Sequence, residues 1–283
     1  MKILIIGNND GPLRLTRALV ESGHRVVGVG LQKYTPALHT ALMAYCPLVA
    51  ATPDEAAAAD FIRGRSFDLL VNCFANFRYR YLHHRYDTLN VHPSPLPRYR
   101  GRHPLQWALI NGERQFGITI HRLTDDFDAG AILWQEQISV TPGWSAVELR
   151  EALLTALEQA WPTFVKAYAA GTIKAVANSE ERATHVTRRT PADSRMRDWQ
   201  DRDRVWRKIR ALRHDPHPAY LSVGDQRYVL NDAALGTRRY IGFRTGQVVR
   251  TRPDTREVIC GDGRTLILYA AFGDSFPVNS CVP

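Results

Sequence analysis

Residues 88–101, TLNVHPSPLPRYRG, are the stretch that decides how this chain folds. Thr88 to His92 alternates in polarity like the end of a strand, so Asn90 and His92 are expected to project from the same face. Three prolines follow at positions 93, 95 and 97. They cannot continue a central strand, and they predict a stiff loop. An amide and an imidazole at such a strand end are suited to addition to a carbonyl, because the amide can stabilise an oxyanion and the imidazole can move a proton.

Upstream of this stretch, strand-like apolar runs alternate with helix-like runs. The alternation predicts an α/β fold with a Rossmann-like, mostly parallel sheet and right-handed crossovers. In such sheets the site lies at the carboxyl ends of strands, which is where His92 falls. The loop at 7–11, GNNDG, lacks the three-glycine fingerprint of dinucleotide sites and disfavours nicotinamide binding. Strands are predicted at 2–7, 25–30, 47–50, 67–74 and 88–92, and helices at 13–22, 36–45 and 53–63.

Downstream, residues 116–123 and 131–140 are predicted to form a hairpin at the sheet edge, with Asp128 at its tip. A long amphipathic helix over 145–170 opens with Ser145 and with Glu148 three residues on, a capping-box pattern. The polar segment 171–193 is predicted to be a linker. Beyond it, a basic helix and short strands separated by glycine turns indicate a small C-terminal β-barrel-like domain. These elements are expected at 202–212, 227–231, 246–251, 257–260 and 265–269.

Composition indicates a soluble two-domain protein. The chain has 283 residues, of which 45% are hydrophobic and 23% charged. No apolar run approaches the ~20 residues that span a bilayer, and the N-terminus lacks the apolar core of a signal peptide. The four cysteines lack metal-ligand spacing, so we expect a reduced, cytoplasmic protein without membrane partners. They are Cys46, Cys73, Cys260 and Cys281.

The net charge of +9 is concentrated in the C-terminal part of the chain. After residue 170, 20 Lys and Arg face 13 Asp and Glu. A solubilising surface would explain any single arginine. As a regional bias, the charge favours an anionic partner, either a phosphate-bearing substrate or a nucleic acid.

Three segments in order resemble the folate-dependent formyltransferase family. They are LNVHPSPLPRYRG at 89–101, FGITIH at 116–121 and DAGAIL at 128–133. The family signature is Asn-x-His, then Leu-Pro and a glycine, then Gly-x-Thr-(Ile/Val) and Asp-x-Gly-x-(Ile/Leu). The resemblance implies that residues 1–170 form the catalytic domain. Residues 194–283 resemble the family's C-terminal module more loosely.

The resemblance implies that Asn90, His92 and Asp128 are the catalytic residues and that N10-formyltetrahydrofolate donates the formyl group without a metal. A neutral amine would attack the formyl carbon, while Asn90 and a charged His92 stabilise the oxyanion. We expect Asp128 to raise the pKa of His92 and to help accept the amine proton. His121 is expected to be a core or supporting histidine.

Two further groups of residues are candidates for binding. By resemblance, the segment after strand 67–74 lies against the pterin ring of the donor, and the predicted donor contacts are Phe74, Asn76, Phe77 and Asp125. An arginine cluster just past the catalytic strand could contact a phosphate or carboxylate of the acceptor. The predicted acceptor contacts are Ser94, Arg98, Tyr99, Arg100 and Arg102.

The identity of the acceptor amine stays open at this level. The connection GLQKYT at 30–35 lacks the long basic insertion that methionyl-tRNA formyltransferases carry. This favours a small acceptor, first a nucleotide-linked amino sugar, and next a hydroxylated amino acid in siderophore assembly. The tRNA enzyme is the alternative suggested by the basic C-terminal part. Two other classes have weaker support: a metal-dependent hydrolase using His92 and Asp128, and a nucleic-acid-binding module.

Overall fold

A computed structural model of the chain describes residues 1–77 and 82–283. The chain forms two compact units, one of residues 1–101, 116–138 and 151–186 and the other of residues 102–115, 139–150 and 187–283. In this division the segments 102–115 and 139–150 belong with the C-terminal residues. The sequence predicted two continuous domains instead, with limits at residues 170 and 194, and these limits remain a proposal.

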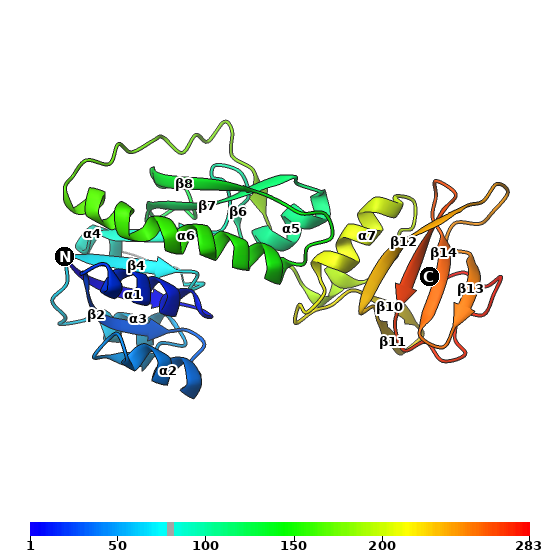
Figure 1. Ribbon diagram of the computed structural model, residues 1–283, viewed down its shortest axis with the longest axis horizontal. Helices are drawn as coiled ribbons and strands as arrows, with labels where there is room; N and C mark the ends of the chain where they lie inside the picture. The colour runs from blue at the N-terminus through cyan, green and yellow to red at the C-terminus, as the bar shows by residue number, and fades with distance from the viewer. Residues whose placement is uncertain (78–81) are drawn as a thin grey trace. The chain divides into compact units, whose positions relative to one another are not determined.

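The first unit is built on a seven-stranded sheet (Figure 1). Five neighbouring strands in it are parallel, and β7 runs antiparallel to β5. This confirms the predicted Rossmann-like, mostly parallel sheet, with the hairpin strands at its edge. The strand order is β3 (Val49–Ala51), β2 (Arg25–Leu31), β1 (Lys2–Gly7), β4 (Leu69–Cys73), β5 (Thr88–His92), β7 (Gln115–Arg122) and β8 (Ile132–Ser139).

Helices accompany these strands, and three of them begin at recognisable caps. Thr35 and Asp54 each accept a hydrogen bond from the backbone N–H three residues on, which satisfies a donor at the start of α2 and α3. Ser145 and Glu148 form the predicted capping box at the start of α6. The helices are α1 (Gly11–Glu21), α2 (Pro36–Met43), α3 (Glu55–Ile62), α4 (Leu82–Arg85) and α6 (Ala146–Ala169).

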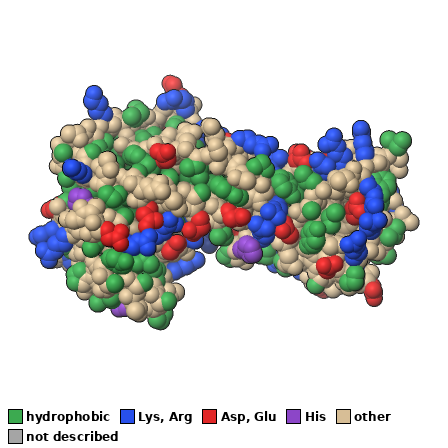
Figure 2. All heavy atoms as spheres, viewed as in Figure 1, with side chains coloured by type: hydrophobic (Ala, Val, Ile, Leu, Met, Phe, Trp, Pro, Cys, Tyr) green, Lys and Arg blue, Asp and Glu red, His purple; other side chains and the backbone are tan. Residues whose placement is uncertain are grey.

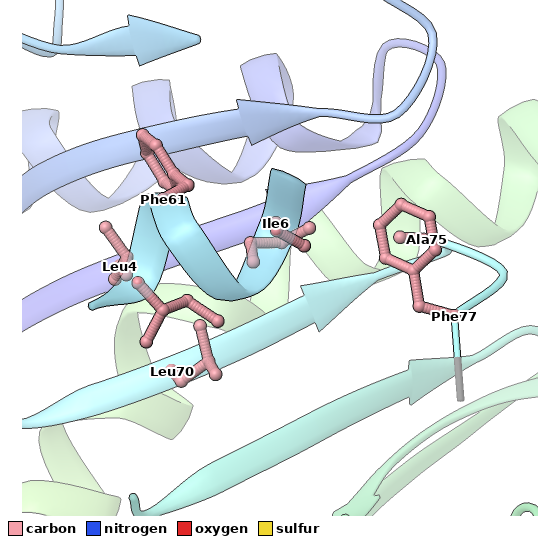
Figure 3. Packing of buried hydrophobic residues seen from close by; sticks show 8 residues of the cluster. Leu4, Ile6, Phe61, Leu70, Ala75 and Phe77 are labelled. Carbon is pink, nitrogen blue, oxygen red and sulfur yellow. The ribbon is translucent and has the colours of Figure 1, made fainter. Parts of the chain in front are cut away.

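The core of this unit packs side chains of the central strands against α3. Leu4 and Ile6 of β1, Leu70 of β4 and Phe61 of α3 belong to one buried cluster (Figure 3). Strands buried in this way need apolar residues at successive positions, which is why they appear in the sequence as continuous apolar runs. The cluster continues to Ala75 and Phe77, beyond the end of β4.

Strand register places three polar residues in one row across the sheet. Asn72 of β4 is paired with Asn90 of β5, and Asn90 is paired with His121 of β7. Residues paired in register project from the same face of a sheet, so their side chains are neighbours. All three are at least 92% buried. Buried polar groups need hydrogen-bond partners, and this row is where the candidate site begins.

The second unit contains α5 (Pro104–Asn111), α7 (Arg202–Ala211) and antiparallel sheets, which confirms the predicted β-rich C-terminal domain. A four-stranded sheet has the order β12 (Asp232–Arg239), β15 (Arg264–Tyr269), β14 (Thr255–Ile259) and β13 (Val248–Arg252). A separate hairpin joins β10 (Tyr220–Val223) to β11 (Gln226–Val229). The predictions had omitted α5, β10 and β12.

Lys and Arg side chains gather on the exposed surface of the second unit (Figure 2). Four of the exposed arginines lie on β12 and β13, namely Arg238, Arg239, Arg250 and Arg252. Among the residues that the structure describes, no helix combines the length and the apolar character needed to cross a bilayer.

Candidate active site

The three residues predicted to be catalytic come together in the first unit. Asn90 and His92 are on β5, and Asp128 is in the loop between β7 and β8. One carboxylate oxygen of Asp128, Oδ1, lies 3.3 Å from Asn90 Nδ2 and 3.3 Å from His92 Nδ1. The side chains of His92 and Asp128 are 7% and 10% exposed. An amide, an imidazole and a carboxylate therefore meet at one carboxylate oxygen, at a point where the side chains are almost completely buried.

Backbone groups and the side-chain amide of Asn178 hold Asp128 in place. Its second oxygen, Oδ2, accepts a hydrogen bond from the Gly101 N–H at 2.9 Å. Asn178 Nδ2 donates to the carbonyl oxygens of Asp128 and Gly130, at 2.7 and 3.0 Å. Asp128 has a φ of 54°, in the left-handed region that few residues other than glycine adopt. Such a conformation persists only where surrounding contacts fix it, as they do here.

Two of the three glycines in the predicted motifs, Gly130 and Gly101, are required by close backbone approaches. A Cβ at Gly130 would lie 1.9 Å from the Arg122 carbonyl oxygen, so no other residue fits beside β7. Gly101 has a φ of 104°, and a Cβ there would lie 2.3 Å from the Val186 carbonyl oxygen. Gly101 belongs to β6 (Arg100–Gly101), which pairs with β9 (His185–Val186). The glycines thus keep the loops that carry and hold Asp128 close to the sheet.

The hydrogen bonds of His92 identify its tautomer. Its Nε2 lies 3.0 Å from the carbonyl oxygen of Tyr99, which can only accept, so Nε2 carries a proton. Burial lowers the pKa of His92, and this outweighs the opposing effects of Asp128 and the Tyr99 carbonyl. The imidazole is therefore neutral in the resting site, with the lone pair of Nδ1 facing the Asp128 carboxylate.

The sequence predicted that Asp128 raises the pKa of His92. Asp128 does act to raise the pKa, but the cost of charging a fully buried imidazole is larger. For Asp128 itself, burial acts to raise the pKa, yet its polar contacts, among them the hydrogen bond from the Gly101 N–H, bring it below its ordinary value. The resting pair is thus a carboxylate facing a neutral imidazole. His92 Nδ1 and Asp128 Oδ1 both lack a proton in this state. A proton bound to Nδ1 could form a hydrogen bond to Oδ1, so the pair is suited to accept a proton during a reaction.

The predicted acceptor contacts divide into inward and outward side chains. Ser94 Oγ donates to the Arg98 carbonyl oxygen at 2.8 Å and so closes the loop. Tyr99 is buried and meets Phe116 edge to face, with ring centroids 5.3 Å apart. Arg100 is buried and bonded to Asn178 and Glu180. These three contacts support the loop structure. Arg98 and Arg102 are exposed, and substrate contact by any of the five remains a prediction.

The predicted donor contacts lie next to the same strand ends. Phe74, with a φ of 65°, follows β4 directly. The Asn76 N–H donates to Gln32 Oε1 at 3.0 Å, and Phe77 is buried. Asp125 is exposed, in the loop that carries Asp128. The arrangement is compatible with donor binding here, which stays a prediction for each residue.

Asp125 also has two histidine neighbours that the sequence did not single out. Its two carboxylate oxygens lie 3.7 Å from His83 Nε2 and 3.5 Å from His84 Nε2. Within residues 1–77 and 82–283, this is the group of side chains with the donor atoms and spacing to hold a metal ion.

Two residues of the site were not predicted. Asn178 lies in the segment expected to be a linker, and no local signal marks it. Asn72 interrupts an otherwise apolar strand, LLVNC, and a polar residue at a position expected to be buried is the signal that could have identified it. Its Nδ2 donates to Asn90 Oδ1 at 2.7 Å.

Known proteins share this fold and this combination of domains. A family model described as formyl transferase matches residues 81–165, and one described as formyl transferase, C-terminal domain, matches residues 190–279. Together they span more than half of the chain. The chain therefore belongs to the folate-dependent formyltransferase family.

Solved structures show the same fold at low sequence identity. The N-formyltransferase from Helicobacter canadensis, in complex with folinic acid and dTDP-3-aminofucose, has a TM-score of 0.75 at 15% identity, with 95% of this chain and 99% of that chain covered. A sugar N-formyltransferase from Shewanella has a TM-score of 0.67 at 19% identity, with coverage of 81% and 96%. HypX from Aquifex aeolicus in complex with tetrahydrofolic acid has a TM-score of 0.66 at 21% identity. The match to HypX covers 95% of this chain but only 43% of that longer chain.

Proposed function

We propose that the protein transfers a formyl group from N10-formyltetrahydrofolate to a primary amine. The observation that carries this proposal is the meeting of an amide N–H donor, a neutral imidazole and a carboxylate at one buried point, with 3.3 Å from Asp128 Oδ1 to each of the two nitrogens. Membership of the formyltransferase family supports the same reaction. The donor is supported by the folate ligands in the structures of HypX and the Helicobacter enzyme.

The proposed reaction begins when the neutral amine attacks the formyl carbon and a new C–N bond forms. The carbonyl electrons move to oxygen, and the Asn90 amide N–H stabilises that oxyanion. The proton lost by the amine passes to Nδ1 of His92, where Asp128 stabilises the resulting imidazolium. When the intermediate collapses, the bond from the formyl carbon to N10 breaks and N10 takes the proton back from His92, which returns to its neutral form. The products are an N-formyl amine and tetrahydrofolate.

For the acceptor, we propose an amino group on a nucleotide-linked sugar. The support is the nucleotide-linked amino sugar bound to the Helicobacter enzyme, whose whole length this fold matches. The connection between β2 and α2 is only residues 32–35. It lacks the long basic insertion expected of an enzyme that binds RNA, which also supports a small acceptor. A hydroxylated amino acid is an alternative small acceptor.

Methionyl-tRNA is the second candidate acceptor, and a specific feature favours it. The exposed arginines of β12 and β13 form a positive surface on the C-terminal unit. Phosphate backbones bind such surfaces in a salt-dependent manner. The two acceptors can be separated by direct assay.

A panel of amines tests the proposed function. Purified protein is mixed with N10-formyltetrahydrofolate and, in turn, a nucleotide-linked amino sugar, a hydroxylated amino acid or methionyl-tRNA, and tetrahydrofolate release is followed. We expect release with the nucleotide-linked amino sugar. Release with methionyl-tRNA alone would replace the proposed acceptor, and no release with any amine would count against formyl transfer.

Ligand binding gives a measurement that needs no turnover. A ligand that binds only the folded protein raises the melting temperature by mass action. We expect tetrahydrofolate to raise it and NAD to leave it unchanged. A rise with NAD alone would overturn the donor assignment.

A further inference from the structure

Asn90 can serve the proposed reaction in only one of its two amide orientations. Its carboxamide has an N–H₂ end and an oxygen end of nearly the same shape, so a half-turn about χ2 exchanges a donor for an acceptor. Oxyanion stabilisation requires the N–H₂ end to face the reacting carbonyl. An inverted amide would present an oxygen to the developing negative charge. Something must therefore fix the orientation before the substrate arrives.

On one side, Asn72 fixes the oxygen end of Asn90. Asn72 Nδ2 donates to the Ala75 carbonyl oxygen at 3.1 Å and to Asn90 Oδ1 at 2.7 Å. The Ala75 carbonyl can only accept, so it sets which end of Asn72 is the N–H₂ group. That group in turn needs an acceptor on β5, which the oxygen of Asn90 supplies.

On the other side, His121 fixes the nitrogen end of Asn90. His121 Nδ1 lies 2.9 Å from the Arg122 carbonyl oxygen, which can only accept, so Nδ1 carries a proton. With its proton on Nδ1, the ring can accept at Nε2, which lies 2.9 Å from Asn90 Nδ2. Among the residues that the structure describes, the other contact of Asn90 Nδ2 is the longer one, 3.3 Å, with Asp128 Oδ1. This weakly held N–H is the one available to a substrate oxygen.

We propose that Asn72 and His121 are positioning residues that clamp the Asn90 carboxamide with its N–H₂ end toward the reacting formyl oxygen. The backbone carbonyls of Ala75 and Arg122 accept hydrogen bonds from Asn72 and His121. They thereby fix which atoms donate and which accept along the row Asn72, Asn90 and His121. The clamp acts through Asn90 and touches no substrate. This inference rests on the proposed function and adds to it the residues that orient its oxyanion donor.

The sharpest test removes the hydrogen bond from Asn72 to Asn90 by a substitution that keeps the shape of the side chain. Asn72→Asp replaces the donor facing Asn90 Oδ1 with an acceptor, which favours the inverted amide. We expect kcat to fall by at least about tenfold at pH 8, since loss of an oxyanion donor costs about 10²–10³-fold. The KM values of donor and acceptor should change little. Relative to wild type at each pH, activity should recover as the pH falls, because the introduced carboxyl group can donate again once it is protonated.

Further variants separate positioning from folding. Asn72→Leu removes the donor at similar volume. The matched control is Thr88→Val, also at a buried position, on β5, because among the described residues the Thr88 hydroxyl donates to the Tyr86 carbonyl oxygen and not to Asn90. His121→Leu should lower kcat more than His121→Gln, whose side-chain oxygen can accept the same N–H. In an Asn90→Ala background, Asn72→Leu should cause no further loss of activity. A wild-type kcat in Asn72→Asp would overturn the inference. So would an Asn72→Leu change that lowers kcat as much in the Asn90→Ala background as it does in wild type.

Side-chain amide NMR tests the clamp without turnover. The Asn90 N–H₂ resonance, identified by its absence in Asn90→Ala, should shift in Asn72→Leu and His121→Leu and stay unchanged in Thr88→Val. An unmoved resonance would contradict the clamp whatever the enzyme's activity. Lack of formyl transfer by wild type with every amine would instead count against the proposed function.

Discussion

Burial sets the charge of His92 more strongly than the neighbouring carboxylate does. The imidazole lies 3.3 Å from Asp128 Oδ1, yet its pKa is lowered because charging it in a closed site is costly. A catalyst that must take up a proton benefits from starting neutral. His92 lies at the strand end that the sequence predicted. Its lowered pKa was not predicted, because the sequence does not show how deeply the imidazole is buried.

The pH dependence of stability should reveal this state of His92. In the unfolded chain its pKa is near 6.5, whereas in the folded protein it is lower. As the pH falls, the unfolded state takes up the proton first, so the contribution of His92 to stability is present above pH ~6.5 and is lost below it. Urea denaturation of wild type and His92→Gln from pH 8 to 5 measures this. Wild type should lose more stability than the variant over that range, and an equal or smaller loss would show that the pKa is not lowered.

The elements that carry the site follow from local sequence signals to different degrees. Strands β1 and β5 have the predicted bounds, 2–7 and 88–92, because apolar runs and the prolines after His92 define them. Strand β12, DAALGTRR, was not predicted because its small residues and glycine show no alternation, and it pairs with β15 across the domain. The row from Asn72 to His121 depends on register between distant strands, which local patterns do not specify.

The long helix α6 offers a test at the scale of an element. Ser145 and Glu148 bond each other through backbone and side-chain groups, with the Ser145 N–H and Oγ both 2.7 Å from a Glu148 carboxylate oxygen. Ser145→Ala should lower the free energy of unfolding by ~1 kcal/mol. Ser145→Thr, which keeps the hydroxyl, is the control and should lose less. Equal stability of Ser145→Ala and wild type in urea denaturation would show that this cap contributes nothing.

At the scale of the whole molecule, charge bears on the choice of acceptor. Most of the formal charge of +9 lies after residue 170, and exposed arginines line β12 and β13. The proposed site needs only a few phosphate contacts. An RNA acceptor would need many, and its binding would weaken steeply with salt.

A salt series on formyl transfer measures this difference. With a nucleotide-linked amino sugar, kcat/KM should change only weakly as salt is raised. Arg250→Ala/Arg252→Ala on β13 should leave that value near wild type. Efficient formylation of methionyl-tRNA, falling steeply with salt and weakened by the double variant, would make the tRNA enzyme correct and show that the C-terminal charge has a direct role in substrate binding.

The central claim is that Asn90, His92 and Asp128 carry formyl transfer from N10-formyltetrahydrofolate. Its most direct test is the rate of tetrahydrofolate release, at saturating donor and acceptor, for wild type and for Asn90→Ala, His92→Ala and Asp128→Ala, with melting temperatures to confirm folding. Each variant should remain folded and lose about 10²-fold or more in rate, as removal of oxyanion donors and proton-transfer groups does. A folded His92→Ala variant with a rate near that of wild type would contradict the account.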